Sequence, residues 1–383
     1  MRKESPAGSG VRYGLFLMMF GFGFTLTMIA PLLPRMVESF ALTLAQGSLF
    51  TVSMNTGGIL GVALVGLIGE RFRKNLLYLT GYAVLLACLI IVGFAGGYEI
   101  ILALFFVLGA GSRISDTLAN PLITENYRED ANRNLNMMHM SISLGGLLGP
   151  VTLRLLMELD VSWQNTFRFL GGLCLFCFIF GAFLLRDAAR VQKPVKRVEG
   201  RPVWFNGAVI TAGLIFFFYS GHQIILNVWS SMYMEEVYDV TPMIASASTT
   251  LFWIGITVSR LIGSHVANEK NARALIRGGA ALGAAALAAA VFTGNPVVAM
   301  ACFTVTGLLS GAIIPILMFI VTRECPDRAG QISSALYLFS MTACMAFPWI
   351  CGVFADNFGF EAGMSVSVAA LFAVAALTYR RFY

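Results

Sequence analysis

Apolar segments of about 20 residues recur along the whole chain, a length that lets one helix cross the hydrocarbon core of a bilayer. This feature limits the possible folds more than any other. We expect twelve spans, at residues 12–36, 47–68, 76–96, 100–124, 134–157, 165–186, 204–232, 244–266, 274–293, 296–322, 331–354 and 361–379. Charged residues make up only 12% of the 383 residues, about half the fraction found in soluble domains. The sequence therefore predicts an all-α polytopic membrane protein without a sizeable soluble domain.

Lysine and arginine are distributed unevenly between the two ends of these spans. With a cytoplasmic N-terminus, 21 of the 26 basic residues fall in cytoplasmic segments. Cytoplasmic loops carry such an excess, so we expect both termini to face the cytoplasm. The same bias accounts for the net charge of +6, and we expect no nucleic-acid partner. Short loops and modest length favour the plasma membrane of a bacterium, that is, its inner membrane.

A long basic linker at residues 187–203 divides the predicted spans six and six. We therefore expect an N-terminal six-helix bundle at residues 1–186 and a C-terminal six-helix bundle at residues 204–383. The first span is too long for the apolar core of a signal peptide and lacks a small-residue cleavage site, so we expect it to be retained.

Landmarks in the two halves have matching spacing. Pro150 follows Gly66 by 84 residues, and Pro348 follows Gly263 by 85 residues. Two similar six-helix halves imply a pseudo-twofold axis along the membrane normal, with a site between the halves near mid-depth. The fold expected from spacing is thus two pseudo-symmetric bundles that can alternate between inward-open and outward-open states.

Small residues four apart predict where helices approach closely. Gly57 and Gly61 form one such pair, and Gly145 and Gly149 form another. Their small size lets two helix backbones come together. Pro150 follows directly and is expected to bend its helix.

Arg113 and Asp116 lie inside an apolar span. An ionisable group at bilayer depth costs several kcal/mol unless it is paired or hydrated, so such residues are candidates for function. Three residues apart, the two side chains share a helix face and can pair. Competition between a proton, Arg113 and solute for Asp116 would give the coupling that a symporter needs. The alternative is a static pair that only ties helices together.

Polar residues in the next span are candidates for the same site. Asn120 lies one turn beyond Asp116 on the same face, and Asn136 and His139 enter the membrane at similar depths after the connecting loop. A helical hairpin would bring these four side chains to one level. We therefore predict that Asn120, Asn136 and His139 contribute to solute binding.

Other unusual residues in the spans have simpler explanations. Arg154 and Glu158 are four apart near an outer interface and are expected to form a surface pair. Arg260 lies near the inner end of its span and is expected to extend to the cytoplasmic surface. Cys174 and Cys177 are spaced like a metal or redox pair, but they lie mid-span without a second pair, which favours packing.

The turn after the second span, Gly66-Leu-Ile-Gly-Glu70-Arg71-Phe-Arg-Lys-Asn, resembles the signature loop of the major facilitator superfamily. That loop reads Gly, any, Leu, small, Asp, Arg, any, Gly, Arg, Lys. Here glutamate replaces the aspartate and an arginine replaces the second glycine. The resemblance implies that Gly66, Glu70 and Arg71 form a conformational latch on the inner face. A solvated turn is the alternative.

Within this superfamily, five segments resemble the fucose permease-like sugar:proton symporters. They are DTLANP, RNLNMMHMSISLGGLLGP, YSGHQIILNVWSSMY, FWIGITVSRLIG and QISSALYLFSMTACMAFPWICGVFAD. The resemblance implies that the proton-linked acid falls on Asp116 and that a solute-binding position falls on His139. It also implies a solute-binding position at Gln223, with Tyr219, Asn227 and Trp229 lining the cavity.

One position departs from the family pattern. Fucose permease has an aspartate just before Leu-Leu-Pro in its first span, and Ala30 takes the corresponding place in TMIAPLLP. Arg113 also lies outside the expected pattern and favours an anionic or otherwise different solute. The residues themselves agree with a sugar site, because aromatic faces stack on sugar rings and amides bond hydroxyl groups.

These observations favour proton-coupled symport of a sugar or similar small polar metabolite. The alternative is an efflux transporter, such as a drug or metabolite:proton antiporter. The 18 methionines of the chain support this alternative, because methionine suits an adaptable apolar cavity. A receptor or assembly protein is a third class, but it gives no reason to bury Asp116. We expect no enzyme activity, no metal and no cofactor other than the proton. We further expect a monomer whose partners are the bilayer and a small solute.

Overall fold

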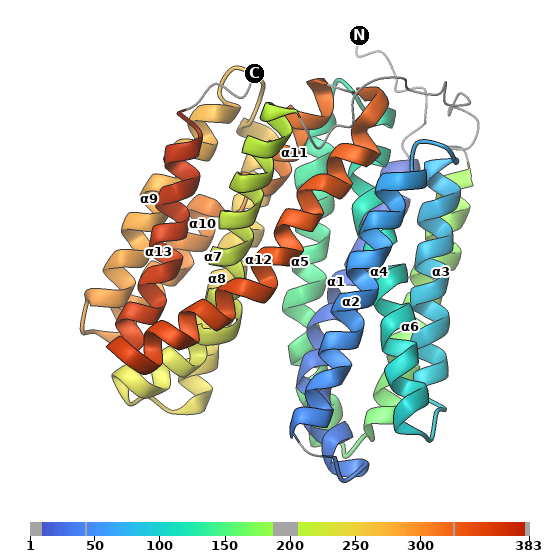
Figure 1. The fold of residues 1–383 in the computed structure, drawn as a ribbon, viewed down its shortest axis with the longest axis horizontal. Coiled ribbons are helices and arrows are strands. Elements are labelled where there is room, and N and C mark those ends of the chain that lie inside the picture. Colours follow the sequence, from blue (N-terminus) through green and yellow to red (C-terminus); the bar gives the residue numbers. More distant parts are fainter. Residues whose placement is uncertain (1–9, 43, 187–205, 325, 380–383) are drawn as a thin grey trace. The chain divides into compact units, whose positions relative to one another are not determined.

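The computed structural model describes residues 10–42, 44–186, 206–324 and 326–379, and these residues form helices without a strand (Figure 1). The helices of the first half are α1 (Gly10–Ser39), α2 (Leu44–Ile68), α3 (Lys74–Val92), α4 (Tyr98–Asn126), α5 (Ala131–Glu158) and α6 (Trp163–Leu185). Those of the second half are α7 (Gly207–Tyr238), α8 (Pro242–Val266), α9 (Ala272–Phe292), α10 (Pro296–Ser310), α11 (Ile313–Glu324), α12 (Ala329–Phe358) and α13 (Phe360–Leu377). A short 3-10 helix, η3 (Pro326–Arg328), precedes α12.

Every predicted span coincides with a helix, if α10 and α11 are taken together as one interrupted span. Eleven segments of the described residues are long and apolar enough to cross a membrane, and the 25-residue α8 is the predicted span that falls outside this set. The largest difference in a boundary is at α7, which continues to Tyr238 rather than ending near residue 232. The predicted fold class, an all-α polytopic membrane protein, is confirmed.

Polar residues define where several helices begin. The side-chain oxygen of Asn206 accepts a hydrogen bond from the backbone nitrogen of Ala208 at 2.9 Å, before α7. Asn295 does the same for Val297 at 3.0 Å, before α10. These caps satisfy amide groups that have no acceptor within the first turn of a helix. The apolar run alone would not fix these starting points.

Contacts divide the chain into two compact units. Within the described residues, the first unit comprises residues 10–134, 141–186 and 326–334, and the second comprises residues 135–140, 206–324 and 335–379. A short part of α5 therefore belongs to the second unit, and the start of α12 belongs to the first. The predicted linker at 187–203 lies outside the described residues, and the predicted domain limits stay a prediction.

The two units pack their helices in the same order. In the first unit, α1 contacts α6, α2 contacts α4, and α3 contacts both α4 and α6. In the second unit, α7 contacts α13, α8 contacts α10, and α9 contacts both α10 and α13. Each contact in one unit thus has a counterpart in the other, which is the pattern expected of an internal repeat.

Glycines place the same crossing in both units. A Cβ atom on Gly57 would overlap the carbonyl oxygen of Phe106, and one on Gly255 would overlap the carbonyl oxygen of Thr304, 198 residues further on for both partners. Gly109 and Gly307 repeat this relation from the opposite helix, against Met54 and Phe252 at the same offset. The α2–α4 and α8–α10 crossings are therefore one motif used twice, and its close approach confirms the prediction made from Gly57.

The second predicted glycine pair lies between α5 and α1. A Cβ atom on Gly145 would overlap the carbonyl of Phe20, and one on Gly149 would lie 2.8 Å from the carbonyl oxygen of Phe24. Pro150 follows within α5, which continues through it to Glu158. The predicted close packing of this glycine pair is confirmed.

Large apolar side chains cover much of the outer surface. Leu67, Phe94, Phe292 and Trp349 each expose more than two thirds of their surface. Exposed apolar area of this extent is unfavourable in water but suits a lipid environment. The exposure pattern therefore agrees with a multi-pass membrane protein.

Candidate functional site

Arg113 and Asp116 form an ion pair on α4, as their spacing predicts. The Nη1 atom of Arg113 lies 2.9 Å from Oδ2 of Asp116, and the two side chains are 26% and 6% exposed. The acid is therefore buried, while part of its cationic partner stays accessible. A carboxylate held in this way can exchange one partner for another, because the ion pair is open on the arginine side.

The neighbouring helix α3 approaches α4 closely beside Asp116. The hydroxyl of Ser115 donates to the backbone oxygen of Tyr78 at 3.1 Å, and a Cβ atom on Gly81 would lie 2.9 Å from the carbonyl oxygen of Gly111. Asp116, the next residue after Ser115, is 5% exposed. The predicted site is thus built on rigid, closely packed helices rather than on a loop.

Asn120 is fully buried one turn beyond Asp116. Its side-chain nitrogen donates to the backbone oxygen of Asp116 at 3.3 Å. Asn120 therefore supports the backbone that carries the acid. Its predicted contact with solute is not tested by this geometry and stays a prediction, as does its grouping with the polar residues of α5.

His139 and Asn136 lie on the part of α5 that belongs to the second unit, and both are buried. The backbone oxygen of His139 accepts a hydrogen bond from Nη1 of Arg260 at 2.8 Å. A Cβ atom on Gly263 would lie 2.8 Å from the side-chain oxygen of Asn136. Within the second unit, this segment of α5 therefore packs directly on α8.

The prediction for Arg260 was wrong. We expected its side chain to extend to the cytoplasmic surface, but the residue is 4% exposed. Its Nε atom donates to the backbone oxygen of Gly311 at 3.2 Å, in addition to the bond with His139. The carbonyl groups around it give the guanidinium hydrogen-bond acceptors inside the unit, so it has no need to reach water.

Three of the four α7 residues predicted for the solute site lie on one stripe of the helix, four residues apart. Tyr219 is fully buried, Gln223 is partly buried, and Asn227 is exposed on the second unit. The side-chain oxygen of Asn227 accepts a hydrogen bond from the indole nitrogen of Trp253 on α8 at 2.9 Å. Trp253 is an additional aromatic neighbour that the sequence interpretation left out.

Trp229 is held against the second part of α12. Its indole nitrogen donates to the backbone oxygen of Pro348 at 3.2 Å, and its ring lies edge-to-face with Phe360 at a centroid distance of 5.9 Å. Because its hydrogen-bond donor is in use, a contact of Trp229 with solute would involve the ring face alone. Its predicted place in a cavity stays a prediction.

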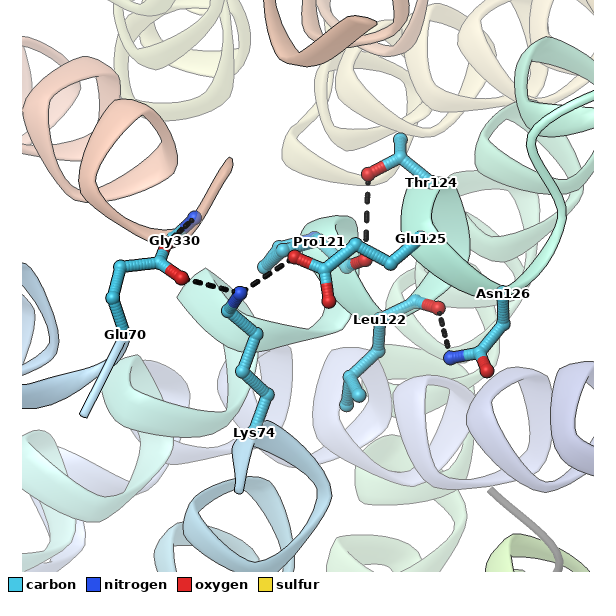
Figure 2. A network of polar contacts seen from close by, with 8 residues as sticks. All are labelled: Glu70, Lys74, Pro121, Leu122, Thr124, Glu125, Asn126 and Gly330. Carbon is cyan, nitrogen blue, oxygen red and sulfur yellow. Dashed lines mark hydrogen bonds and ion pairs between the residues drawn. The ribbon is translucent and has the colours of Figure 1, made fainter. Parts of the chain in front are cut away.

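A charged network joins the loop after α2 to the start of α12, within the first unit (Figure 2). Oε1 of Glu70 accepts a hydrogen bond from the backbone nitrogen of Gly330 at 2.7 Å. The Nζ atom of Lys74 lies 2.6 Å from Oε2 of Glu70 and 2.6 Å from Oε1 of Glu125. The Gly330 amide lies in the first turn of α12 and lacks a helical acceptor, so the carboxylate of Glu70 caps that helix.

Two of the three predicted latch residues lie away from this network. Gly66 lies in the last turn of α2, and Arg71 is exposed. Lys74, not Arg71, is the base between the two carboxylates. Lys74 and Glu125 were missed, although Lys74 belongs to the quoted sequence motif and Glu125 directly follows the predicted span that contains Asp116.

Two simpler interpretations are confirmed. Arg154 and Glu158 form a surface pair at 3.0 Å, with side chains that are 70% and 57% exposed. Cys174 and Cys177 are buried free thiols, and the sulfur of Cys174 lies 3.3 Å from the hydroxyl of Thr25. The thiol pair contributes to packing between α1 and α6.

Comparison with known proteins places the chain. Residues 15–348 match the family model of the Major Facilitator Superfamily. A protein of Helicobacter pylori strain J99, provisionally named a glucose/galactose transporter, is 21% identical over 89% of this chain and 88% of its own length. The glucose/mannose transporter GlcP of Bacillus subtilis is 20% identical over 84% of this chain and 83% of its own length.

Solved structures share the fold. The Escherichia coli fucose:proton symporter FucP superposes with a TM-score of 0.75 at 16% identity, over 96% of this chain and 97% of that chain. The human organic anion transporter MFSD10 gives 0.78 at 15% identity, over 96% of this chain and 99% of that chain. The match of the family model covers most of the residues, and the likeness to the fucose symporter confirms the resemblance noted in the sequence. The chain belongs to the Major Facilitator Superfamily.

Proposed function

We propose that this protein is a secondary active transporter that couples uptake of a monosaccharide, or a similar small polar metabolite, to the proton gradient by alternating access. Its family supports transport, and the names of the H. pylori and B. subtilis relatives support a sugar as the solute. The observation that carries proton coupling is the buried carboxylate of Asp116 beside an arginine whose side chain is 26% exposed.

Asp116 carries the coupling proton in this proposal. When it is ionised, Arg113 neutralises it at 2.9 Å. When it takes up a proton, the pair is weakened and Arg113 is released toward solute or water. Since a buried unpaired charge is costly, the two states exchange neutralisation by Arg113 for neutralisation by a proton. Proton binding and solute binding are linked because both change the partner of one carboxyl group.

Solute binding is assigned to the polar and aromatic residues predicted from the sequence. His139, Asn120 and Asn136 belong to α4 and α5, whereas Tyr219, Gln223, Asn227 and Trp229 belong to α7. Amide and imidazole groups bond sugar hydroxyls, and aromatic faces pack on the apolar face of a sugar ring. The pair of Asn227 and Trp253 supports this assignment, because the indole fixes the orientation of the amide.

The network around Glu70 serves as the latch for one conformational state. Glu70 holds the start of α12 through the Gly330 amide, and Lys74 holds Glu70 and Glu125 together. Loss of these charge-assisted bonds would free α12 to move. We assign the protein to a bacterial inner membrane with both termini in the cytoplasm, as a monomer; these termini lie outside the described residues.

Transport in proteoliposomes tests the proposal. Asp116→Asn should abolish proton-driven accumulation of solute and leave exchange of solute across the membrane at equal concentrations. Accumulation at the wild-type level would contradict the coupling role. A thermal-shift screen of monosaccharides, organic acids and drugs selects the solute beforehand. Stabilisation by organic acids or drugs alone, together with proton-driven export, would favour the efflux alternative.

A further inference from the structure

The span formed by α10 and α11 is interrupted at Gly311 and Ala312. A helical carbonyl normally accepts from the amide four residues later, and for Gly311 that residue is Pro315, which has no N–H group. The proline ring also crowds the carbonyl four residues before it. Pro315 falls in the first turn of α11, where its missing donor costs nothing. The chain therefore ends one helix before the proline and begins another.

Two consecutive residues of α8 satisfy the backbone groups at this interruption. The hydroxyl of Ser259 accepts from the backbone nitrogen of Ala312 at 3.1 Å. The Nε atom of Arg260 donates to the carbonyl oxygen of Gly311 at 3.2 Å. All four residues are buried. Interrupted membrane helices line binding sites in transporters. Other residues that contact this interruption are therefore candidates for a functional role.

Arg260 extends from the interruption to the α5 segment. The same guanidinium uses Nη1 to donate to the carbonyl oxygen of His139 at 2.8 Å. One turn further along α8, Gly263 leaves room for a second contact: a Cβ atom there would lie 2.8 Å from both Asn136 Oδ1 and the Cβ atom of Ala312. Two predicted solute-binding residues are thus packed against one face of α8, beside the interruption.

We propose that Arg260 is a positioning residue for the solute site, which fixes the backbone of His139 relative to the α10–α11 interruption. The assignment of His139 to solute binding rests on the proposed function. The link that Arg260 makes between the backbones of His139 and Gly311 does not depend on that function. The planar guanidinium holds two donors at a fixed separation, so it sets the distance between the two carbonyl groups. A lysine at this position would keep the charge but present its donors from a single atom.

Hydrogen–deuterium exchange on the purified, solute-free protein tests the link. In Arg260→Lys, we expect faster amide exchange both at residues 311–316 and at residues 139–143. Ser259→Ala is the matched control, since it frees a backbone group at the same interruption without a bond to His139; exchange should rise at residues 311–316 alone. Wild-type exchange at residues 139–143 in Arg260→Lys would overturn the inference.

Solute affinity gives a second readout, with D-glucose as the probe. We expect Arg260→Lys to weaken binding by about tenfold, equivalent to 1.4 kcal/mol, and Ser259→Ala to change it by less than about twofold. In a His139→Ala background, Arg260→Lys should have a much smaller effect, because contacting residues are coupled. Equal effects in both backgrounds would overturn the inference. If wild-type protein binds neither D-glucose nor another monosaccharide, the proposed solute is wrong, and the exchange experiment decides the positioning link by itself.

Discussion

The α2–α4 crossing of the first unit and the α8–α10 crossing of the second have the same glycine contacts, but their charged residues lie at different positions. The glycine contacts repeat at an offset of 198 residues. At that offset, Arg113 and Asp116 correspond to Gly311 and Ile314. In the first unit both charges stand on one helix and neutralise each other, and the helix is continuous.

In the second unit the charge stands on the opposite helix of the crossing. Arg260 corresponds to Val62 of α2 at the same offset, and its Nε and Nη1 atoms donate to backbone carbonyl groups. A helix interrupted by proline can thus accept a buried cation through its own unsatisfied backbone. The comparison shows that glycines set the repeated helix crossing, whereas one or two residues per unit decide which charged groups stand at the crossing and what neutralises them.

The largest effect should come from the shared frame. Gly57→Ala and Gly255→Ala each place a Cβ atom against a backbone carbonyl, and overpacking of this kind costs about 1–3 kcal/mol per site. Thermal unfolding in detergent should show similar losses for the two variants, and their double variant should lose about 2–6 kcal/mol because distant sites add.

Open glycines serve as controls for this test. Gly172 and Gly278 have no atom near the place of a Cβ, so alanine there should raise stability by up to about 1 kcal/mol through helix propensity. A large loss of stability in Gly57→Ala with no loss in Gly255→Ala would show that the two crossings are not equivalent.

The next largest difference in stability should be between variants of the buried Arg260 and the partly buried Arg113. Arg260→Ala leaves the Gly311 carbonyl without a donor, because Pro315 cannot supply one, and an unsatisfied buried acceptor costs about 1–3 kcal/mol. Arg113→Ala leaves the carboxyl group of Asp116, which is 6% exposed, without Arg113. Because that carboxyl group can take up a proton in place of the arginine, we expect a smaller loss of stability, which decreases further as the pH falls. Unfolding midpoints of the two variants measure the difference; equal losses would contradict the distinction between backbone and side-chain neutralisation.

How far the sequence predicts these features depends on what each one needs. The spans follow from local apolar runs, so all twelve positions coincide with helices. The ion pair of Arg113 and Asp116 follows from spacing within one helix. Gly57 predicts a close approach, but the partner helix is known only from the fold.

The remaining features depend on contacts between segments far apart in the chain. Pro315 can bend or interrupt a helix, and the outcome depends on Ser259 and Arg260 being in place to satisfy the backbone. Arg260 lies near a span end, which made exposure the natural expectation, and no sequence signal placed acceptors around it. Between the end of α2 and the start of α3, Arg71 and Lys74 are both basic, and only the directions of their side chains distinguish their roles.

Proline substitutions compare the continuous helix α4 with the interrupted span of α10 and α11, and their expected effects on stability are smaller. Pro315→Ala restores an N–H group opposite the Gly311 carbonyl. This N–H group can compete with Arg260 for the carbonyl, and α10 and α11 can then join into one helix. A net hydrogen bond is worth about 0.5–1.5 kcal/mol. Pro121→Ala makes the same chemical change in α4, which is already continuous. We expect altered amide exchange at residues 311–316 in the first variant and little change around residues 117–121 in the second. An unchanged pattern in Pro315→Ala would show that Gly311, rather than the proline, causes the interruption.

The smallest effect concerns two ion pairs that look alike in sequence. Arg154 and Glu158 are 70% and 57% exposed, whereas Arg113 and Asp116 are 26% and 6% exposed. Solvent screens the exposed pair, so a double-mutant cycle of alanine substitutions should give a coupling of no more than about 0.5 kcal/mol for it. The partly buried pair should give a larger coupling, since less water surrounds it. Added salt should reduce the first value and leave most of the second. If both cycles gave the same coupling with the same salt dependence, burial of Asp116 would have no electrostatic consequence, and the competition between proton and arginine would lose its physical basis.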